Sequence, residues 1–344
     1  MTGPPNLTKT ARTPLFFIIG RARSGTTLIR TLFDAHPNVN IPVESPFIVR
    51  LHRKYAKIRY WDKNKLLRFF DDLQKVLYFE NWNIDREKLK TDLLLCEGYN
   101  KYQTICKVVI CNYSSIFEKH EILVYGDKNP VYSLSINKLF KLYPDSKYIY
   151  LTRDYRDHIL SMLRTELYTP DILALAYRWC YSVRLMKKLI ITHHESFLTV
   201  RYEDFIQDPY LHLEKMCNFI GIEFKPEVLE FHKHEKEAGD LFPREMREKF
   251  FNNLFKPIDA SRIYMWKKQM ADDDVRKVDC MVGKWAEYSG YERKYKDPEP
   301  PVLFKVIPVK LYLGIYYSLS FIRRRLPRWL RSRKHSHVLR KAEE

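Results

Sequence analysis

The sequence predicts an α/β fold in which a parallel β-sheet is flanked by helices. Three short apolar segments are typical of buried strands, namely residues 14–20, 148–152 and 197–200. Such strands alternate with longer segments of helical spacing, which indicates parallel strands joined by crossover helices. Two additions are predicted, a helical insertion over residues 50–105 and a basic C-terminal extension over residues 296–344.

The composition fits one large domain or two modest ones. The chain has 344 residues, and its 45% hydrophobic content is enough for a sizeable core. Lys and Arg outnumber Asp and Glu by 60 to 42, which gives a net charge of +18. This charge favours anionic partners, whether nucleotides, nucleic acid or a membrane surface, and does not choose among them.

The cysteines and the N-terminus are consistent with a cytosolic protein. The six cysteines form no CxxC pair and no tight cluster, so we expect buried free thiols and no metal site. Residues 1–14 lack the charged start, apolar core and cleavage site of a signal peptide. No stretch of about 20 uncharged apolar residues is present, so no membrane-spanning helix is expected.

The first predicted strand leads into a loop that fits an anion. Residues Gly20–Thr27 match the outline GxxxxGx[ST] of a P-loop, in which backbone N–H groups and the following helix attract phosphate. Thr26 stands where nucleoside triphosphatases carry the Lys that neutralises a triphosphate together with Mg²⁺. The loop therefore fits a shorter anion, with Arg23 supplying charge. The structural alternative is a strand-to-helix turn that binds nothing.

Residues Arg23–Leu28, followed by Asp34–Pro37, resemble the 5'-phosphosulfate loop of the sulfotransferase superfamily. The resemblance is closest to the branch of tyrosylprotein and many bacterial sulfotransferases, and it spans about residues 14–295, the predicted sulfotransferase domain. It implies 3'-phosphoadenosine-5'-phosphosulfate (PAPS) as donor, the desulfonated nucleotide (PAP) as product, and no metal. The donor-binding residues that it implies in the loop are Arg23, Ser24, Gly25, Thr26 and Thr27.

Residues Thr152–Asp157, continued by Ser161, resemble the family's 3'-phosphate motif. Arg153 at the strand end and Ser161 two turns into the helix would share one side, where a forked donor and a hydroxyl can hold one phosphate. The alternative is an Arg–Asp surface pair at a helix start. Tyr155 stands where the family usually has Gly, a departure that affects the shape of the loop.

Two later segments extend the resemblance. Residues Val200–Asp204 match the family's Y-E-D segment, which implies that Tyr202 contributes to the nucleotide pocket. Residues Ser261–Lys268 resemble the late loop that closes over the donor, and they make Ser261 and Lys267 candidates there.

Sulfuryl transfer requires in-line attack by an acceptor oxygen, a base for its proton, and positive charge near the departing nucleotide. Glu44 lies 21 residues after Arg23, where the resembling tyrosylprotein enzymes carry their base, so Glu44 is the predicted general base. His36 is a rival base, although its place at a helix end favours a structural role.

The departing nucleotide gains negative charge, so positively charged residues are expected near it. Residues Gly126–Pro130 resemble the family's D/N-K-x-P segment, which implies that Lys128 lies near the transferring group. Arg23 and Lys128 would then stabilise charge on the leaving phosphate, and Ser261 would donate a hydrogen bond nearby.

The C-terminal extension suggests a membrane surface. Residues 311–322 are uncharged, and residues 323–341 contain nine Lys or Arg and no acidic residue. The uncharged stretch is too short to span a bilayer, but beside these basic residues it suits the interface of an anionic membrane. The alternative is a helix packed on the domain, followed by a solvated tail.

Other functions compete with sulfuryl transfer. A P-loop kinase is disfavoured by the missing loop Lys and by the lack of a clear Mg²⁺-binding carboxylate, while a non-enzymatic basic module lacks a nucleic-acid recognition motif, so no nucleic acid is expected. The acceptor is predicted to bear a hydroxyl: a carbohydrate, glycolipid or small metabolite. Peptide tyrosine is less favoured, because Pro42 replaces the branch's usual Cys and a cytosolic enzyme would not meet secreted proteins. The sequence does not indicate the oligomeric state.

Overall fold

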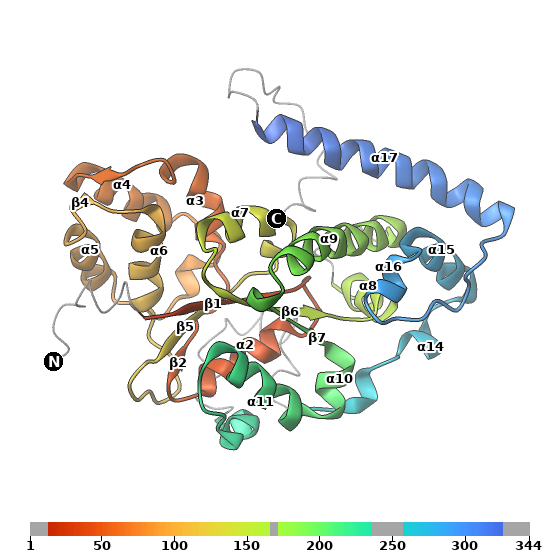
Figure 1. Cartoon of the computed structure of the whole chain (residues 1–344), viewed down its shortest axis with the longest axis horizontal. Helices are drawn as coiled ribbons and strands as arrows, with labels where there is room; N and C mark the ends of the chain where they lie inside the picture. Colours follow the sequence, from red (N-terminus) through yellow and green to blue (C-terminus); the bar gives the residue numbers. More distant parts are fainter. Residues whose placement is uncertain (1–12, 166–170, 235–256, 326–344) are drawn as a thin grey trace. The chain divides into compact units, whose positions relative to one another are not determined.

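The computed structural model describes residues 13–165, 171–234 and 257–325. The chain divides into two compact units, of which Met1–Thr152 and Leu189–Asp259 form the first. Arg153–Lys188 and Ala260–Glu344 form the second. Figure 1 shows the order of the elements along the chain. The boundary predicted between residues 295 and 296 falls inside the second unit and stays a prediction.

The first unit contains a five-stranded sheet of order β2-β5-β1-β6-β7, in which every pairing is parallel. The strands are β1 (Leu15–Ile19), β2 (Val39–Asn40), β5 (Val124–Lys128), β6 (Lys147–Thr152) and β7 (Phe197–Arg201). The three strands predicted from apolar runs, β1, β6 and β7, are confirmed. Strands β2 and β5 were not predicted, because β2 is two residues long and β5 carries charged residues at its carboxyl end.

Strand β1 forms the centre of the core. All five of its residues are buried, so both faces of the sheet are covered there, as an apolar run without alternation predicts. On one face the Phe17 ring stacks on Tyr148 with centroids 5.3 Å apart. The Phe16 ring meets Phe33 of α2 (Thr26–Ala35) edge-on at 5.1 Å. This packing fixes the strand that leads into the predicted anion loop.

The segment predicted as a helical insertion over residues 50–105 is helical. Its helices are α3 (Phe47–Tyr55), α4 (Lys63–Leu73), α5 (Arg86–Leu94) and α6 (Tyr102–Cys111). Asp62 and Asp85 cap α4 and α5 by accepting bonds from backbone N–H groups. A short antiparallel pair, β3 (Tyr60–Trp61) with β4 (Gly98–Tyr99), ties the segment together. Its role as a cap over the acceptor stays a prediction.

The remaining helices of the first unit follow the strands. They are α7 (Tyr132–Leu142), α10 (Tyr202–Gln207) and α11 (Pro209–Ile220). The residues at its two ends explain the bounds of α11. Asp208 caps its first turn, Pro209 occupies its first position, and Gly221 ends the helix at φ 80°.

The second unit is helical in its described residues. It contains α8 (Tyr155–Leu163), most of α9 (Ile172–Thr192), α14 (Trp266–Gln269), α15 (Asp272–Val282), α16 (Trp285–Tyr288) and α17 (Pro300–Arg325). Tyr155, at the position where the family usually has Gly, is fully buried, and its hydroxyl donates to Asp279 of α15. Its ring lies 5.5 Å from that of Trp179, so Tyr155 belongs to the core of this unit.

All six cysteines are free, as the sequence predicts, and four of them are buried. Burial raises the pKa of Cys96 to about 11 and that of Cys180 to about 12. These thiols are therefore protonated at neutral pH and behave as small apolar side chains.

One helix of the described residues is long and apolar enough, by length and composition, to cross a membrane: residues Pro300–Leu319 of α17. The sequence has no uncharged apolar stretch of this length, because Lys305 and Lys310 lie within these residues; α17 begins at Pro300 and continues for 26 residues, which include the uncharged residues 311–322. The expectation that no helix spans a membrane stays a prediction.

Candidate active site

The predicted anion loop joins β1 to α2 in a left-handed turn. Arg23 and Gly25 have φ angles of 67° and 90°, and the N–H of Ser24 donates to the carbonyl of Arg21 at 3.2 Å. Left-handed residues within a turn direct neighbouring N–H groups into one concavity, which binds anions. A left-handed residue other than Gly is strained, and such strain gathers at functional sites.

Gly25 is required by space as well as by conformation. A Cβ atom there would lie 2.4 Å from Cδ2 of Tyr202, whose ring therefore lies directly against the loop. Tyr202 is the first residue of α10, and it is only 9% exposed. The structure thus brings the predicted nucleotide-pocket aromatic together with the loop.

Helix α2 presents its positive end to this turn. No acidic residue lies in its first turn, and Gly25 at the N-cap offers no capping side chain. The N–H groups of the first turn and the helix dipole therefore suit an external anion. Ser24 and Thr26 are nearly buried, and Thr27 is half-buried.

Lys128 links the loop to the predicted base. It ends β5, which pairs with β1, and its side chain is 1% exposed. Its ammonium donates to Thr27 Oγ1 at 3.0 Å and to Glu44 Oε1. Burial lowers the pKa of Lys128, and the carboxylate of Glu44 opposes this shift. The predicted base, the predicted cation and one predicted donor-binding residue thus meet beside the carboxyl ends of two neighbouring strands, where open α/β sheets bind ligands.

Glu44 stands out in an otherwise buried segment. Residues 41–46 connect β2 to α3, and all of them are buried except Glu44, whose side chain is 28% exposed. A carboxylate that is half-open to solvent on a buried backbone can meet a substrate without losing its position.

The rival base, His36, has a structural role. Its Nδ1 accepts from the N–H of Asn38 at 3.1 Å, which leaves the proton on Nε2, 2.9 Å from the carbonyl of Glu223. Burial lowers the pKa of His36, which favours the neutral ring. Both ring nitrogens therefore serve backbone groups at the end of α2, as the sequence analysis favoured.

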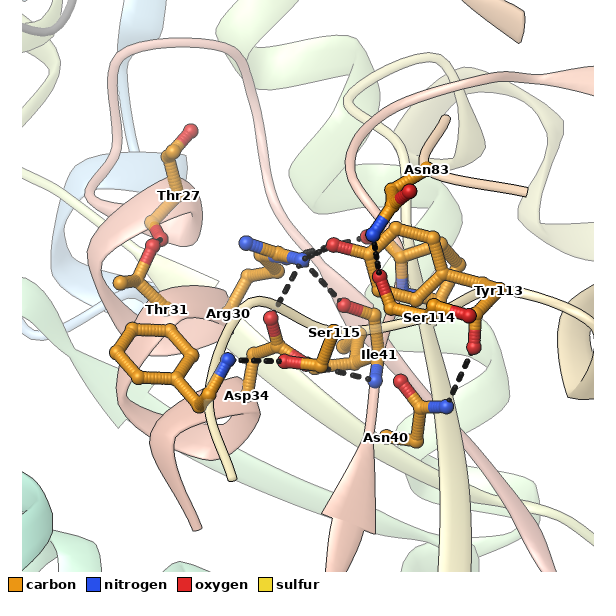
Figure 2. Close-up of polar contacts among 12 residues, drawn as sticks. Thr27, Arg30, Thr31, Asp34, Asn40, Ile41, Asn83, Tyr113, Ser114 and Ser115 are labelled. Atoms are coloured by element: carbon orange, nitrogen blue, oxygen red, sulfur yellow. Dashed lines mark hydrogen bonds and ion pairs between the residues drawn. The ribbon is translucent and has the colours of Figure 1, made fainter. Parts of the chain in front are cut away.

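Arg30 anchors the base-bearing segment, and the sequence analysis missed it. Its guanidinium, 1% exposed, donates to Asp34 Oδ2 at 2.9 Å, to the carbonyl of Pro42 at 3.1 Å and to that of Ile41. Asp34 in turn accepts from the N–H of Ile41 at 3.3 Å. Figure 2 shows these groups converging, with the hydroxyl of Tyr113 at 3.1 Å from Arg30 Nη2. Helix α2 thus holds the main chain two residues before Glu44.

The second unit carries the predicted 3'-phosphate residues. Arg153 follows β6 directly, and its carbonyl accepts from Trp179 Nε1 at 3.0 Å. Asp154 caps α8 by accepting from the N–H of Arg156 at 2.9 Å. Ser161 lies in the second turn of α8 and is half-buried.

The predicted late loop is fastened to the start of α8. Asp157 Oδ1 accepts from the N–H of Trp266 at 2.8 Å, and the guanidinium of Arg156 lies 3.7 Å from the centre of the Trp266 ring. Arg153 donates to the carbonyl of Arg262 at 3.3 Å, next to Ser261. The side chains of Ser261 and Lys267 are exposed.

The predicted residues therefore fall into two groups, one in each unit. The first unit holds Arg23, Ser24, Gly25, Thr26, Thr27, Glu44, Lys128 and Tyr202, and the second holds Arg153, Ser161, Ser261 and Lys267. Across the described ranges, no group of three or more His, Cys, Asp or Glu side chains is placed to bind a metal ion.

Comparison with known proteins identifies the family. Residues 14–226, well over half of the chain, match the model of the Sulfotransferase family. The chain belongs to this family. It is therefore an enzyme of sulfuryl transfer, and neither a kinase nor a non-enzymatic basic module.

Curated relatives and solved structures agree with this assignment. The chain is similar to protein-tyrosine sulfotransferase 1 of Danio rerio, 24% identical over 84% of this chain and 77% of that one. Protein-tyrosine sulfotransferase 2 of Gallus gallus is 25% identical over 84% of this chain and 74% of its own. The predicted likeness to the tyrosylprotein branch is thereby supported.

Two solved structures share the fold. The sulfotransferase domain from the curacin biosynthetic pathway aligns with a TM-score of 0.57 and 21% identity, over 82% of this chain and 99% of that one. The sulfotransferase domain of the Synechococcus PCC 7002 olefin synthase aligns with a TM-score of 0.55 and 20% identity, over 81% and 95%. The predicted α/β fold with a parallel central sheet is confirmed.

Proposed function

We propose that this sulfotransferase transfers the sulfuryl group of PAPS to an acceptor hydroxyl, with Glu44 as general base. One observation carries the proposal: the ammonium of Lys128 lies between Thr27 of the anion loop and the carboxylate of Glu44. Base, cation and loop hydroxyl thus form one cluster next to the N-terminus of α2.

The anion loop is suited to the 5'-phosphosulfate of the donor. Its left-handed turn and the open end of α2 offer N–H groups, and Arg23 adds charge. Ser24, Thr26 and Thr27 supply hydroxyls, and Tyr202 provides an aromatic surface beside Gly25. The sequence pattern assigns the 3'-phosphate to Arg153 and Ser161, and the late contacts to Ser261 and Lys267.

The proposed reaction moves one proton to the base and releases one leaving group. The acceptor oxygen attacks sulfur in line while Glu44 takes its proton. The bond from sulfur to the bridging oxygen breaks, and PAP leaves with an added negative charge. Lys128 and Arg23 stabilise that charge. Lys128 is paired with Glu44, so an anion held in the loop would compete for this ammonium and leave the carboxylate available.

The acceptor bears a hydroxyl. The relatives named for protein tyrosine make a peptide tyrosine one acceptor to test, beside carbohydrates, glycolipids and small metabolites. The replacement of the tyrosylprotein branch's usual Cys by Pro42 does not disturb the contact with Arg30. Arg30 bonds to the backbone carbonyl of Pro42, which any residue would supply. Cytosolic location stays a prediction.

Glu44→Gln tests the base. We expect turnover of labelled PAPS to fall by about 10²–10⁴-fold, while affinity for PAP, measured by calorimetry, stays within a few-fold of wild type. Glu118→Gln, an exposed carboxylate in the same unit, is the matched control and should leave both unchanged. Full activity in the Glu44 variant would refute the assignment of the base, and failure of the wild-type protein to bind PAP would refute the donor.

A further inference from the structure

Helix α17 has apolar side chains on two opposite faces, and the first face is packed. Val302, Val306 and Leu313 are buried within the second unit, where α15 packs against the helix. Further along the same face, the Tyr317 ring stacks on Tyr177 with centroids 5.6 Å apart. These contacts attach α17 to its unit.

The opposite face is exposed and equally apolar. Its large side chains are between 46% and 80% exposed: Phe304, Ile307, Leu311, Tyr312, Ile315 and Leu319. At 3.6 residues per turn they form one continuous stripe, and the nearest cations, Lys305 and Lys310, lie outside it. Single exposed apolar residues are ordinary on a protein surface, but a continuous stripe of six marks an interaction surface.

The charge that follows the stripe indicates its partner. Residues 323–341 carry nine Lys or Arg and no acidic residue, and they begin immediately after the apolar stretch of α17. An apolar surface adjoining a dense positive charge complements a lipid surface with anionic headgroups. We propose that the exposed stripe of α17 lies in the interfacial region of an anionic bilayer, to which the positive charge of the following sequence attracts the protein.

The contacts of α17 favour a helix that lies on the membrane over one that crosses it. A crossing helix would meet lipid on every side that is not covered by another membrane segment. Here Lys310 Nζ donates to the carbonyl of Met281 at 3.1 Å, and Arg178 Nε donates to the hydroxyl of Tyr317 at 2.9 Å. These bonds join Lys310 and Tyr317 of α17 to other residues of the second unit. The exposed apolar stripe lies on the other side of the helix, where it is available to lipid.

Co-sedimentation of the purified full-length protein with vesicles tests this surface. Vesicles of phosphatidylcholine mixed with phosphatidylserine should bind the protein at least about tenfold more tightly than phosphatidylcholine alone. High salt should weaken the binding, because it screens the basic segment. The assay needs neither donor nor acceptor, so its failure is distinct from a failure of the proposed function.

A pair of variants isolates the stripe. Leu311→Glu/Ile315→Glu changes the net charge by −2 on two exposed positions, so the fold should persist, as judged by an unchanged melting temperature. We expect partitioning onto the mixed vesicles to fall at least about tenfold. Lys284→Glu makes the same change of net charge at an exposed site away from the stripe and should reduce binding far less.

Other results would overturn the proposal. If Lys284→Glu reduced vesicle binding as much as the double variant does, net charge and not the apolar stripe would explain the binding. If the protein stayed in membranes through alkaline carbonate extraction, α17 would be a spanning helix. A dimer that the double variant abolishes, without vesicle binding, would assign the stripe to a second copy of the chain. Binding to duplex RNA in place of vesicles would assign the basic segment to nucleic acid.

Discussion

The segment that carries the predicted base and the late loop are built in opposite ways. In the first, Glu44 is the one partly exposed residue of a buried run, and Arg30 binds the backbone carbonyls just before it. In the late loop, residues 260–262 are all exposed, and the loop is fastened by Trp266 a few residues further on.

The difference separates a residue whose backbone is held by buried groups from residues that lie at the surface. A base must sit within hydrogen-bond reach of the acceptor, and the buried Arg30–Asp34 pair holds the main chain just before Glu44. The side chains of Ser261 and Lys267, by contrast, are exposed at the surface of the second unit. Damage to the first segment should therefore lower kcat and stability together, whereas changes in the late loop should act mainly on donor affinity.

The largest effect is expected for Arg30→Met. It removes the anchor of the Ile41 and Pro42 carbonyls and leaves Asp34 buried with Lys119 Nζ, 3.7 Å away, as its remaining cation. Breaking a buried pair from one side costs about 3–5 kcal/mol, which urea unfolding would measure. Arg68→Met, at an exposed position of α4, is the matched control and should change stability little.

A double variant separates positioning from mere stability. Arg30→Met/Asp34→Asn removes the orphaned charge and keeps an acceptor for the N–H of Ile41, so most of the lost stability should return. The carbonyls of Ile41 and Pro42 stay unanchored, so kcat should remain low while PAP affinity is near that of wild type. Recovery of kcat along with stability would show that Arg30 only stabilises the fold.

The anion loop could be predicted from adjacent residues, whereas features that depend on contacts between distant segments could not. The apolar run of β1 and the glycine outline after it are readable from adjacent residues. Strand β5 is not, because Val-Tyr-Gly-Asp-Lys becomes a strand only through its pairing with β1 and β2. Arg30 and Asp34 have the spacing of an ordinary surface pair on a helix, and their burial depends on contacts with residues far along the chain, such as Ile41 and Tyr113. The same limit concealed the length of α17.

An intermediate effect is expected for Asp127→Asn, beside Lys128. Burial raises the pKa of Asp127 to about 7, against bonds donated by Tyr132 and Asn129. The folded protein thus keeps a proton that the unfolded chain releases near its ordinary pKa. The resulting stability is complete below that pKa and is lost as pH rises through about 7, with a slope of at most about 1.4 kcal/mol per pH unit.

Unfolding in urea between about pH 4 and 7 measures this slope. Asp127→Asn cannot release the proton, so its stability should depend on pH less steeply than that of the wild type. Asp145→Asn, an exposed carboxyl in the same unit, should keep the wild-type slope. Parallel curves for wild type and Asp127→Asn would mean that Asp127 is ionised throughout, held by its hydrogen bonds.

The smallest effect is expected for Trp266→Phe. This variant tests whether changes in the late loop act mainly on donor affinity. Among the described residues, the buried indole N–H of Trp266 has no hydrogen-bond partner, so its loss removes no bond within that part of the chain. The backbone bond to Asp157 remains, and a smaller ring still faces Arg156, so stability should fall by only about 0.5–1 kcal/mol. If this loop acts by closing over the donor, the KM for PAPS should rise while kcat with saturating donor stays near that of wild type. A fall in kcat as large as that of the Arg30 variants would instead mean that both segments place groups for the chemical step, and the contrast between them would not hold.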